Sequence, residues 1–344
     1  MKKILKTVAY LALTLSAVCC AKAVKSGPNE ANERYFNAWM EVNYPGAVPS
    51  GSGIYILEEE EGNGSEVKKD NYVYTRYTVT DLEGNITSYT DEETAKQLGE
   101  YAPSAYYGPK VLTTFESTIQ AGLRDVLMGM KAGGRKKVII PGWLMTYNTY
   151  DTPEEYLENS SSGSNCIYDI TVTDVTDNIS KFEIEEIGQY FTQNKDIFGN
   201  MSQADSLKGH YGCYYKQIKA PTDTASFPKD TTIYINYTGR LLSGQVFDTT
   251  DEKTAKDYDI FSSSKAYEPV KIKWGEKYSD ITMGTGGSSV INGFALTLWQ
   301  MRAFEKGIGV FYSPLGYSYN GSGSTIPAYS PLVFEIEIVE EPED

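Results

Sequence analysis

The stretch YINYTGRLLSGQVFDTT, residues 234–250, decides how the second half of this chain folds. Apolar and polar residues alternate up to Tyr237, which is the period of two expected of a strand with one buried face. A turn around Gly244 follows, and Phe247 and Asp248 lie on the returning strand. The stretch therefore predicts a β-hairpin that brings aromatic side chains and one carboxylate close together.

Further segments with clear patterns follow this hairpin. Phe294, Leu298 and Met301 recur at the spacing of one apolar helix face. Every second residue from Leu332 to Ile338 is large and apolar, which predicts a last strand. Between the helix and this strand lie Ser313-Pro314, the Tyr317-Ser318-Tyr319 run and Ile326-Pro327.

The order of these segments closely resembles the FKBP-type peptidyl-prolyl cis-trans isomerases. Their pattern is a Y-T-G strand, G-x-x-F-D, V-I-x-G-W, a helix ending in Met, S-P-x-x-Y-x-Y-G, a loop with I-P and a final L-V-F, and its parts are met here in sequence order. The resemblance is good over residues 214–340. It implies an α+β domain in which an antiparallel sheet curls around one short helix, and a site for proline-containing polypeptides.

The resemblance also implies which residues form that site. Its walls would be Tyr237, Phe247, Val290, Ile291, Phe294, Tyr319 and Phe334, with Asp248 at the edge and Ile326 in an overhanging loop. Phe294 stands where the family has a tryptophan, so the floor stays apolar but loses an indole N–H. The Ile291 N–H and the Tyr319 hydroxyl would hold substrate carbonyls. Asp248 would polarise the tyrosine network or the substrate; the alternative is a carboxylate that caps a turn.

Composition excludes several other classes of function. The 344 residues suggest about two domains. The net charge of -15 argues against binding to nucleic acid or to an anionic membrane surface, because both need clustered Lys and Arg. His210 is the single histidine and has no ligand cluster around it, so a metal site or a His-based triad is not expected. No Walker loop occurs, and we expect no cofactor.

The N-terminus has the pattern of a targeting segment. Three lysines precede an apolar run at residues 8–18, which suits a signal-peptide core and is too short to span a bilayer. The following L-S-A-V-C-C resembles a bacterial lipobox, in which a cysteine becomes the lipid-bearing first residue. The small residue required before the cut favours Cys20 slightly over Cys19. We expect a cell-envelope lipoprotein that faces the periplasm on a lipid anchor.

Two further cysteines, Cys166 and Cys213, lie in different halves of the chain. A disulfide between them is possible in an oxidising compartment, but no framework spacing indicates one. Two isolated buried thiols are the preferred interpretation.

The chain contains an internal repeat at a spacing of about 160 residues. Residues 53–57 recur at 212–216, and Tyr77-Thr78 recurs as Tyr237-Thr238. An aromatic helix precedes each copy, at residues 30–41 and 182–193. The sequence therefore predicts two domains of the same architecture.

The first copy retains the architecture without the site residues. Tyr89-Thr90 would stand where the second copy has Phe247-Asp248, so the acid is missing. Leu123 takes the place of the aromatic floor, and the loop at residues 149–165 has no I-P. We expect this copy to be a scaffold or binding module without isomerase activity.

The second copy is longer than the family pattern at residues 251–280, which contain Tyr258, Phe261 and Trp274. This segment is either an elaborated surface loop or a lid that contributes to substrate binding.

These patterns predict a signal peptide at 1–20, a tether and short helix at 21–52, a degenerate domain at 53–176, a helical linker at 177–211 and an isomerase domain at 212–344. The expected function is prolyl isomerisation that assists the folding of exported proteins. The alternative is a chaperone or peptide-binding lipoprotein without catalysis. A glycan-binding surface protein is suggested only by the tyrosine and tryptophan content.

Overall fold

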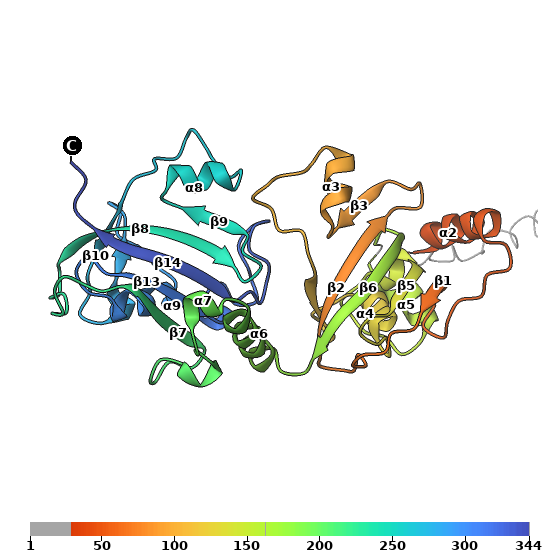
Figure 1. The fold of residues 1–344 in the computed structure, drawn as a ribbon. Coiled ribbons are helices and arrows are strands. Elements are labelled where there is room, and N and C mark those ends of the chain that lie inside the picture. Colours follow the sequence, from red (N-terminus) through yellow and green to blue (C-terminus); the bar gives the residue numbers. More distant parts are fainter. Residues whose placement is uncertain (1–28, 162, 344) are drawn as a thin grey trace, which may run out of the picture.

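The structure is a computed structural model that describes residues 29–161 and 163–343. It shows two lobes, each built on one antiparallel sheet (Figure 1). The predicted signal peptide and the candidate lipid-bearing Cys19 and Cys20 lie outside the described residues. Within the described ranges, no helix combines the length and the apolar character needed to cross a bilayer.

The first domain follows the aromatic helix at its N-terminus. Its elements are α2 (Glu30–Asn43), β1 (Tyr55–Glu60), β2 (Tyr72–Thr80), β3 (Ile86–Tyr89), α3 (Glu92–Leu98), β4 (Lys110–Thr113), α4 (Ala121–Leu127), β5 (Arg135–Ile140), η1 (Gly142–Leu144), α5 (Pro153–Asn159) and β6 (Cys166–Thr176). The strand order is β1-β5-β6-β2-β3, and β4 also pairs with β2. Gly122 lets α4 approach the sheet, because a Cβ there would lie 2.5 Å from the Cγ2 atom of Ile140.

Two helices lead into the second domain, α6 (Ile179–Gln193) and α7 (Lys195–Phe198), followed by the short η2 (Gln203–Asp205). The domain then contains β7 (Cys213–Lys219), β8 (Thr232–Leu241), β9 (Val246–Thr249), α8 (Glu252–Asp257), β10 (Val270–Lys273), η3 (Tyr278–Asp280), β11 (Thr282–Met283), β12 (Ser288–Ser289), α9 (Asn292–Gln300), β13 (Lys306–Phe311), η4 (Ser313–Leu315) and β14 (Leu332–Val339). The strand order is β12-β11-β10-β8-β14-β13-β7, with β9 on β8. The predicted hairpin is thus confirmed as β8 and β9.

Matching strands of the two sheets confirm the repeat. β7, β13, β14 and β8 follow one another in the second sheet as β1, β5, β6 and β2 do in the first. Tyr237 pairs with Ile336 of β14, as Tyr77 pairs with Ile170 of β6. The predicted α+β class, with two domains that each hold an antiparallel sheet and a short helix, is confirmed.

The aromatic helices cover the outer face of their sheets. Phe36 of α2 packs on Tyr55 at 5.7 Å between ring centroids, and Phe191 of α6 packs on Tyr214 at 5.1 Å. Ile184 and Ile187 of α6 join the same buried cluster as Phe191. The segment expected to be a helical linker therefore contributes part of the second domain's apolar core.

The two domains touch through loops and aromatic side chains. Tyr72 of β2 packs edge-on against Tyr329 at 5.2 Å, and Tyr74 lies 4.9 Å from Phe182 of α6. The N–H of Tyr106, in the loop between α3 and β4, donates to the Ser324 carbonyl at 2.8 Å. This loop reaches toward the second lobe in Figure 1.

Candidate functional site

The centre of the candidate site is the β8–β9 hairpin. The register pairs Gly239 with Asp248, and Phe247 precedes Asp248 on the short returning strand. A Cβ on Gly239 would lie 2.5 Å from the Phe247 ring and 2.9 Å from the Phe334 ring. Glycine at this position therefore gives both rings the space they occupy beside the strand.

A cavity of about 570 Å³ opens beside this hairpin, within the size range usual for small-ligand pockets. It is lined by Tyr237, Phe247, Asp248, Met283, Ser289, Val290, Ile291, Phe294, Tyr317, Ser322, Gly323, Thr325, Ile326 and Phe334. The structure thus brings together the residues expected from the sequence, with Tyr319 as the exception. They come from β8, β9, the connection between β12 and α9, α9 itself, β14 and the loop between η4 and β14.

The floor and walls of the cavity are aromatic. Phe294 lies 5.7 Å from Tyr237 and 5.1 Å from Phe334, both in edge-on contact. Phe247 meets Phe334 at 5.5 Å, also edge-on. Phe294 and Phe334 are buried, and the Ile326 side chain is buried above them. These rings form a fixed apolar surface that can hold a flat apolar group away from water.

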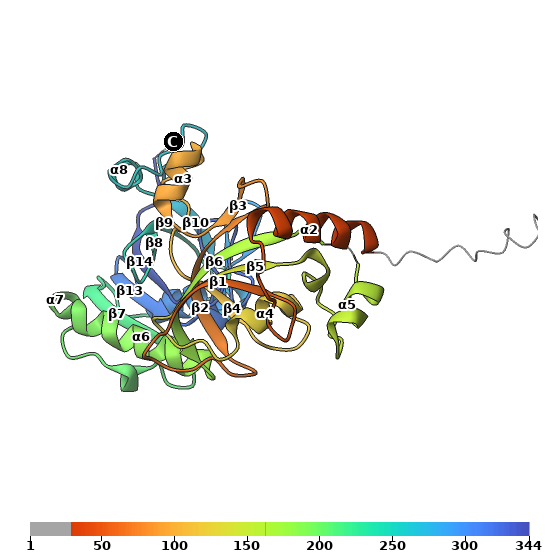
Figure 2. The ribbon, with the colours of Figure 1, turned by 90° about the vertical axis from the view of Figure 1, so that its right-hand side faces the viewer.

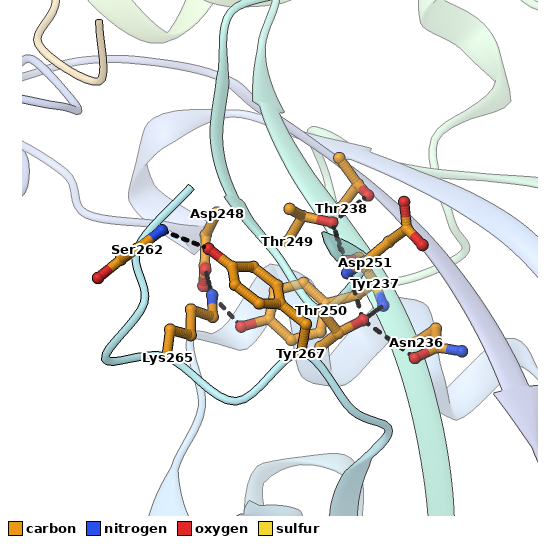
Figure 3. Close-up of polar contacts among 10 residues, drawn as sticks. All are labelled: Asn236, Tyr237, Thr238, Asp248, Thr249, Thr250, Asp251, Ser262, Lys265 and Tyr267. Atoms are coloured by element: carbon orange, nitrogen blue, oxygen red, sulfur yellow. Dashed lines mark hydrogen bonds and ion pairs between the residues drawn. The ribbon is translucent and has the colours of Figure 1, made fainter. Parts of the chain in front are cut away.

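One polar group stands at the rim of this apolar surface (Figure 3). The Tyr237 hydroxyl donates to Asp248 at 2.6 Å, and Lys265 forms an ion pair with the other oxygen of the same carboxylate. Burial, together with the adjacent Asp248 charge, raises the pKa of Tyr237 well above its ordinary value. The phenol therefore stays protonated at neutral pH and remains a hydrogen-bond donor.

The cavity tyrosine from the S-P-x-x-Y-x-Y stretch is Tyr317, so the expectation for Tyr319 was wrong. Tyr319 is 67% exposed, whereas Tyr317 lines the cavity, and burial beside Asp248 raises the Tyr317 pKa. Ser318 between them has a positive φ of 51°, and its carbonyl accepts from the Tyr329 N–H. The backbone bends at this residue, which a motif with two similar tyrosines does not reveal.

Several lining residues carry no sequence signal of their own. Met283 and Ser289 belong to the small β11–β12 pair, and Ser322, Gly323 and Thr325 belong to the loop that carries Ile326. Their types are common in any surface loop. Only the paired strands and the loop path bring them to the cavity.

The same position in the first domain is filled differently. β2 pairs Val79 with Ser88, as β8 pairs Gly239 with Asp248. Ser88 therefore stands at the acid's position, which corrects the expectation that Tyr89-Thr90 would stand there.

The residues that match the cavity lining also differ in size in the first domain. Val79, which takes the position of Gly239, is buried. Thr87 takes the position of Phe247 and is exposed. Leu123 is buried at the predicted floor position. A branched side chain thus fills the volume in which the second domain holds two phenylalanine rings.

The segment after β9 is shared by both domains, so it is not an insertion of the second copy alone. The Ala102 N–H donates to the Tyr107 hydroxyl at 3.0 Å, as the Ser262 N–H donates to Tyr267 at 2.9 Å. Tyr107 stacks on Tyr101, as Tyr267 stacks on Phe261.

In the second domain this segment reaches the site through Lys265, whose place in the first domain is taken by Ala105. Tyr258 and Phe261 are largely exposed, and Trp274 is buried against Trp299 at 5.3 Å. Residues 251–280 are not among those that line the cavity, so the segment meets the site through the ion pair of Lys265 with Asp248.

The two remaining cysteines are separate. Cys166 and Cys213 are both free and buried, and burial raises the pKa of each thiol to about 12. This confirms the preference for isolated thiols. Among residues 29–161 and 163–343, no three His, Cys, Asp or Glu side chains gather as a metal site.

Comparison with known proteins points to one family. A family model described as FKBP-type peptidyl-prolyl cis-trans isomerase matches residues 224–339. FK506-binding protein 1A of Aspergillus fumigatus is 30% identical over 125 residues, which cover 36% of this chain and 90% of that protein.

Two other relatives are aligned over less of their own length. Macrophage infectivity potentiator of Trypanosoma cruzi is 24% identical over 155 residues, 45% of this chain and 63% of that protein. A probable FKBP-type peptidyl-prolyl cis-trans isomerase of Haemophilus influenzae is 25% identical over 167 residues, 47% of this chain and 56% of that protein.

Among solved structures, the matches include the three FKBP domains of wheat FKBP73 and a peptidyl-prolyl cis-trans isomerase from Pseudomonas syringae pv. tomato. The first has a TM-score of 0.29 at 14% identity and covers 85% of this chain and 96% of that chain. The second has a TM-score of 0.30 at 21% identity and covers 48% of this chain and 97% of that chain.

Proposed function

The chain belongs to the FKBP-type peptidyl-prolyl cis-trans isomerase family, and from this premise we propose that its second domain catalyses prolyl isomerisation in polypeptides. The observation that supports the proposal most directly is the cavity of about 570 Å³ beside the β8–β9 hairpin, with aromatic walls and the Tyr237–Asp248 pair at its rim.

The reaction needs a dry surface more than it needs an acid or a base. Rotation about the bond before proline is slow because the amide must lose resonance, at a barrier of about 18 to 20 kcal/mol. No proton is transferred and no covalent intermediate forms. A catalyst lowers the barrier by binding the twisted amide more tightly than the planar one.

Each part of the cavity has a role in this proposal. The proline ring would rest on Phe294, between Phe247 and Phe334, where it is removed from water. The planar amide loses hydration there, which raises the free energy of the ground state. The Ile291 N–H, at the start of α9, would hold a substrate carbonyl, and the Tyr317 hydroxyl would take the role expected of Tyr319. Asp248 orients the Tyr237 hydroxyl through their hydrogen bond, and the ion pair with Lys265 holds the Asp248 carboxylate in place.

The first domain is proposed to be non-catalytic. Val79 fills its corresponding space, and Ser88 replaces the acid. We propose further that the protein is an envelope lipoprotein that assists the folding of exported polypeptides, as the N-terminal pattern predicts. Labelled fatty acid should be incorporated by cells that express the chain, and the label should disappear in a Cys19→Ser, Cys20→Ser double variant. Labelling that survives this double change would contradict the lipid anchor.

The test of catalysis is a two-dimensional exchange experiment or a protease-coupled assay on a short blocked peptide with one proline. We expect Asp248→Ala to lower kcat/KM about tenfold, because the Tyr237 hydroxyl loses its partner. Phe294→Trp should hold or raise it, since the wider ring keeps the apolar floor.

A matched pair of tyrosines controls for general damage. Tyr317→Phe should lower kcat/KM several-fold, whereas Tyr319→Phe, outside the cavity, should leave it unchanged. If the natural chain gives no rate above the uncatalysed one for any residue before proline, the alternative of a peptide-binding protein without catalysis replaces this proposal.

A further inference from the structure

A second hollow lies between the two domains. It encloses about 530 Å³ and is lined on one side by tyrosines of the first domain and on the other by the loop of residues 320–328. We call it the interdomain groove. Gly323 and Ile326 of this loop line both the groove and the candidate active-site cavity. The loop of residues 320–328 thus separates the active-site cavity of the second domain from the interdomain groove, which faces the first domain.

We propose that the interdomain groove is a second subsite, which holds the stretch of substrate polypeptide next to the prolyl bond. The proposal rests on the proposed function of the neighbouring cavity. A polypeptide bound in the active-site cavity extends beyond the rim of that cavity. Gly323 and Ile326 form a wall common to the cavity and the interdomain groove, so the groove is the neighbouring concave surface. An extended chain advances about 3.3 Å per residue, so a few residues suffice to pass from one to the other.

The lining of the groove suits an extended peptide with apolar or aromatic side chains. Tyr77, Tyr89, Tyr106 and Tyr107 contribute four half-buried rings. Tyrosine gives a large flat contact area at low entropic cost together with a hydroxyl for main-chain groups. Glu100 and Lys110 are exposed at the groove, where Glu100 accepts from the Tyr89 hydroxyl at 2.9 Å and Lys110 can meet a carbonyl or carboxylate group of the occupant.

Tyr89 and Tyr106 occupy positions at which the two domains carry different residues, although the segments around them match. The first domain has Tyr89 where the register of the second places Thr249, and Tyr106 where its loop has Ala266. Both rings line the interdomain groove, together with Tyr77 of the same β2–β3 hairpin as Tyr89. They serve the surface that faces the second domain.

The groove is formed without a ligand. The Tyr106 N–H donates to the Ser324 carbonyl at 2.8 Å, and the Gln245 amide donates to the carbonyls of Ala105 at 3.0 Å and Ser104 at 3.3 Å. The first bond joins the two walls of the groove, and the Gln245 side chain ties the same loop of the first domain to the β8–β9 turn. A preformed site loses less entropy on binding than one that must be ordered by its ligand.

The test compares substrates of two lengths on the full chain. One is a blocked tetrapeptide with a central proline, and the other is a peptide of about twelve residues with apolar and aromatic residues on both sides of the same proline. Tyr89→Thr, which introduces the residue found at the matching position of the second domain, should lower kcat/KM for the long peptide about fivefold through KM. The short peptide should change less than twofold.

Two variants keep this test interpretable. Tyr89→Phe retains the ring and should keep most of the long-peptide activity, which a merely unfolded variant would not. Tyr35→Ala removes an exposed tyrosine of the same domain on α2, outside the groove, and should leave both peptides unaffected.

Photo-crosslinking gives a readout that does not require catalysis. A long peptide that carries a benzophenone group four residues from the proline should label residues 100–112 of the first domain, and Tyr89→Thr should weaken the labelling. Equal effects of Tyr89→Thr on both peptides, or labelling confined to other surfaces, would overturn the subsite. If neither peptide is isomerised but the labelling occurs, the proposed catalysis fails and the groove stands.

Discussion

Gly239 shows how one missing side chain creates a site. The Phe247 and Phe334 rings occupy the space that a Cβ on this residue would enter, and Val79 holds the same position in the first domain. We expect Gly239→Ala to push the Phe247 ring into the cavity. The change should lower the affinity for a proline peptide at least tenfold and the free energy of unfolding by about 1 to 3 kcal/mol.

Titration with a proline peptide and urea unfolding measure the two effects. The matched change in the first domain, Val79→Ala, should cost a similar free energy of unfolding and leave peptide affinity unchanged. Unchanged affinity in Gly239→Ala would show that the rings are free to move elsewhere.

Most of the candidate site could be predicted from the sequence, because its residues lie in short motifs with fixed local roles. Phe247-Asp248 ends a hairpin, and Val290-Ile291 precedes a helix. Tyr317 was missed because two tyrosines share one motif and the positive φ of Ser318 decides between them. Lys265 was missed because it lies in a loop whose path depends on tertiary contacts rather than on a repeating pattern.

The helix α6 carries two carboxylates at the border of the domains, Glu183, which is buried, and Glu186, which is half-buried. Glu183 accepts from the Ser313 N–H and hydroxyl, each at 2.6 Å, and so holds the segment that leads to Tyr317. Glu186 lies nearer Tyr74, with Glu183 and Asp174 close by. Burial, followed by the charges of Glu183 and Asp174, raises the pKa of Glu186 to about 7.

This raised pKa predicts a loss of stability as pH rises. The folded state keeps the Glu186 proton that the unfolded state releases near its ordinary pKa of about 4.5. The contribution is therefore fully present below pH 4.5 and is lost as pH rises through about 7. Each unit of pKa is about 1.4 kcal/mol, so the shift from 4.5 to about 7 corresponds to a loss of about 3 kcal/mol.

Urea unfolding from pH 5 to pH 8 measures the effect. Glu186→Gln should flatten the decline, whereas Glu185→Gln, on the exposed side of α6, should leave it unchanged. Parallel curves for all three proteins would show that Glu186 is not the group responsible.

α6 also illustrates what the sequence leaves open about elements. Its apolar positions are spaced as one helix face, so the helix could be predicted, but the same pattern fits a linker helix and a core helix. The distinction depends on Ile308, Val310 and Val333, whose apolar side chains are buried by packing against α6. Those residues lie more than a hundred positions away in the sequence, so the pattern of α6 alone does not predict that they contact it.

The arrangement of the whole molecule makes a related prediction about where the second domain begins. A chain that starts at Asp177 keeps α6 on the sheet, whereas one that starts at Tyr211 leaves Tyr214 and its neighbours exposed. We expect the longer chain to unfold cooperatively. The shorter one should be several kcal/mol less stable, because it loses four buried side chains, Ile184, Ile187, Phe191 and Phe198, at about 1.5 to 3 kcal/mol each before compensation.

Thermal unfolding of both chains by circular dichroism tests this prediction. Ile187→Ala in the longer chain supplies a matched control, with an expected cost of about 2 to 5 kcal/mol. Equal melting temperatures for the two chains would mean that α6 adds no stability to the second sheet.

The hydrogen bond from Tyr106 to Ser324 has a consequence for how ligand binding could be observed. The loop of residues 320–328 forms a wall of the active-site cavity and is tied on its other side to the first domain. A ligand that draws this loop inward would alter its contact with the first domain, and by thermodynamic reciprocity a change in that contact would alter the ligand's affinity. A pair of fluorescent dyes, one on each domain, would then report occupancy of a pocket that neither dye touches.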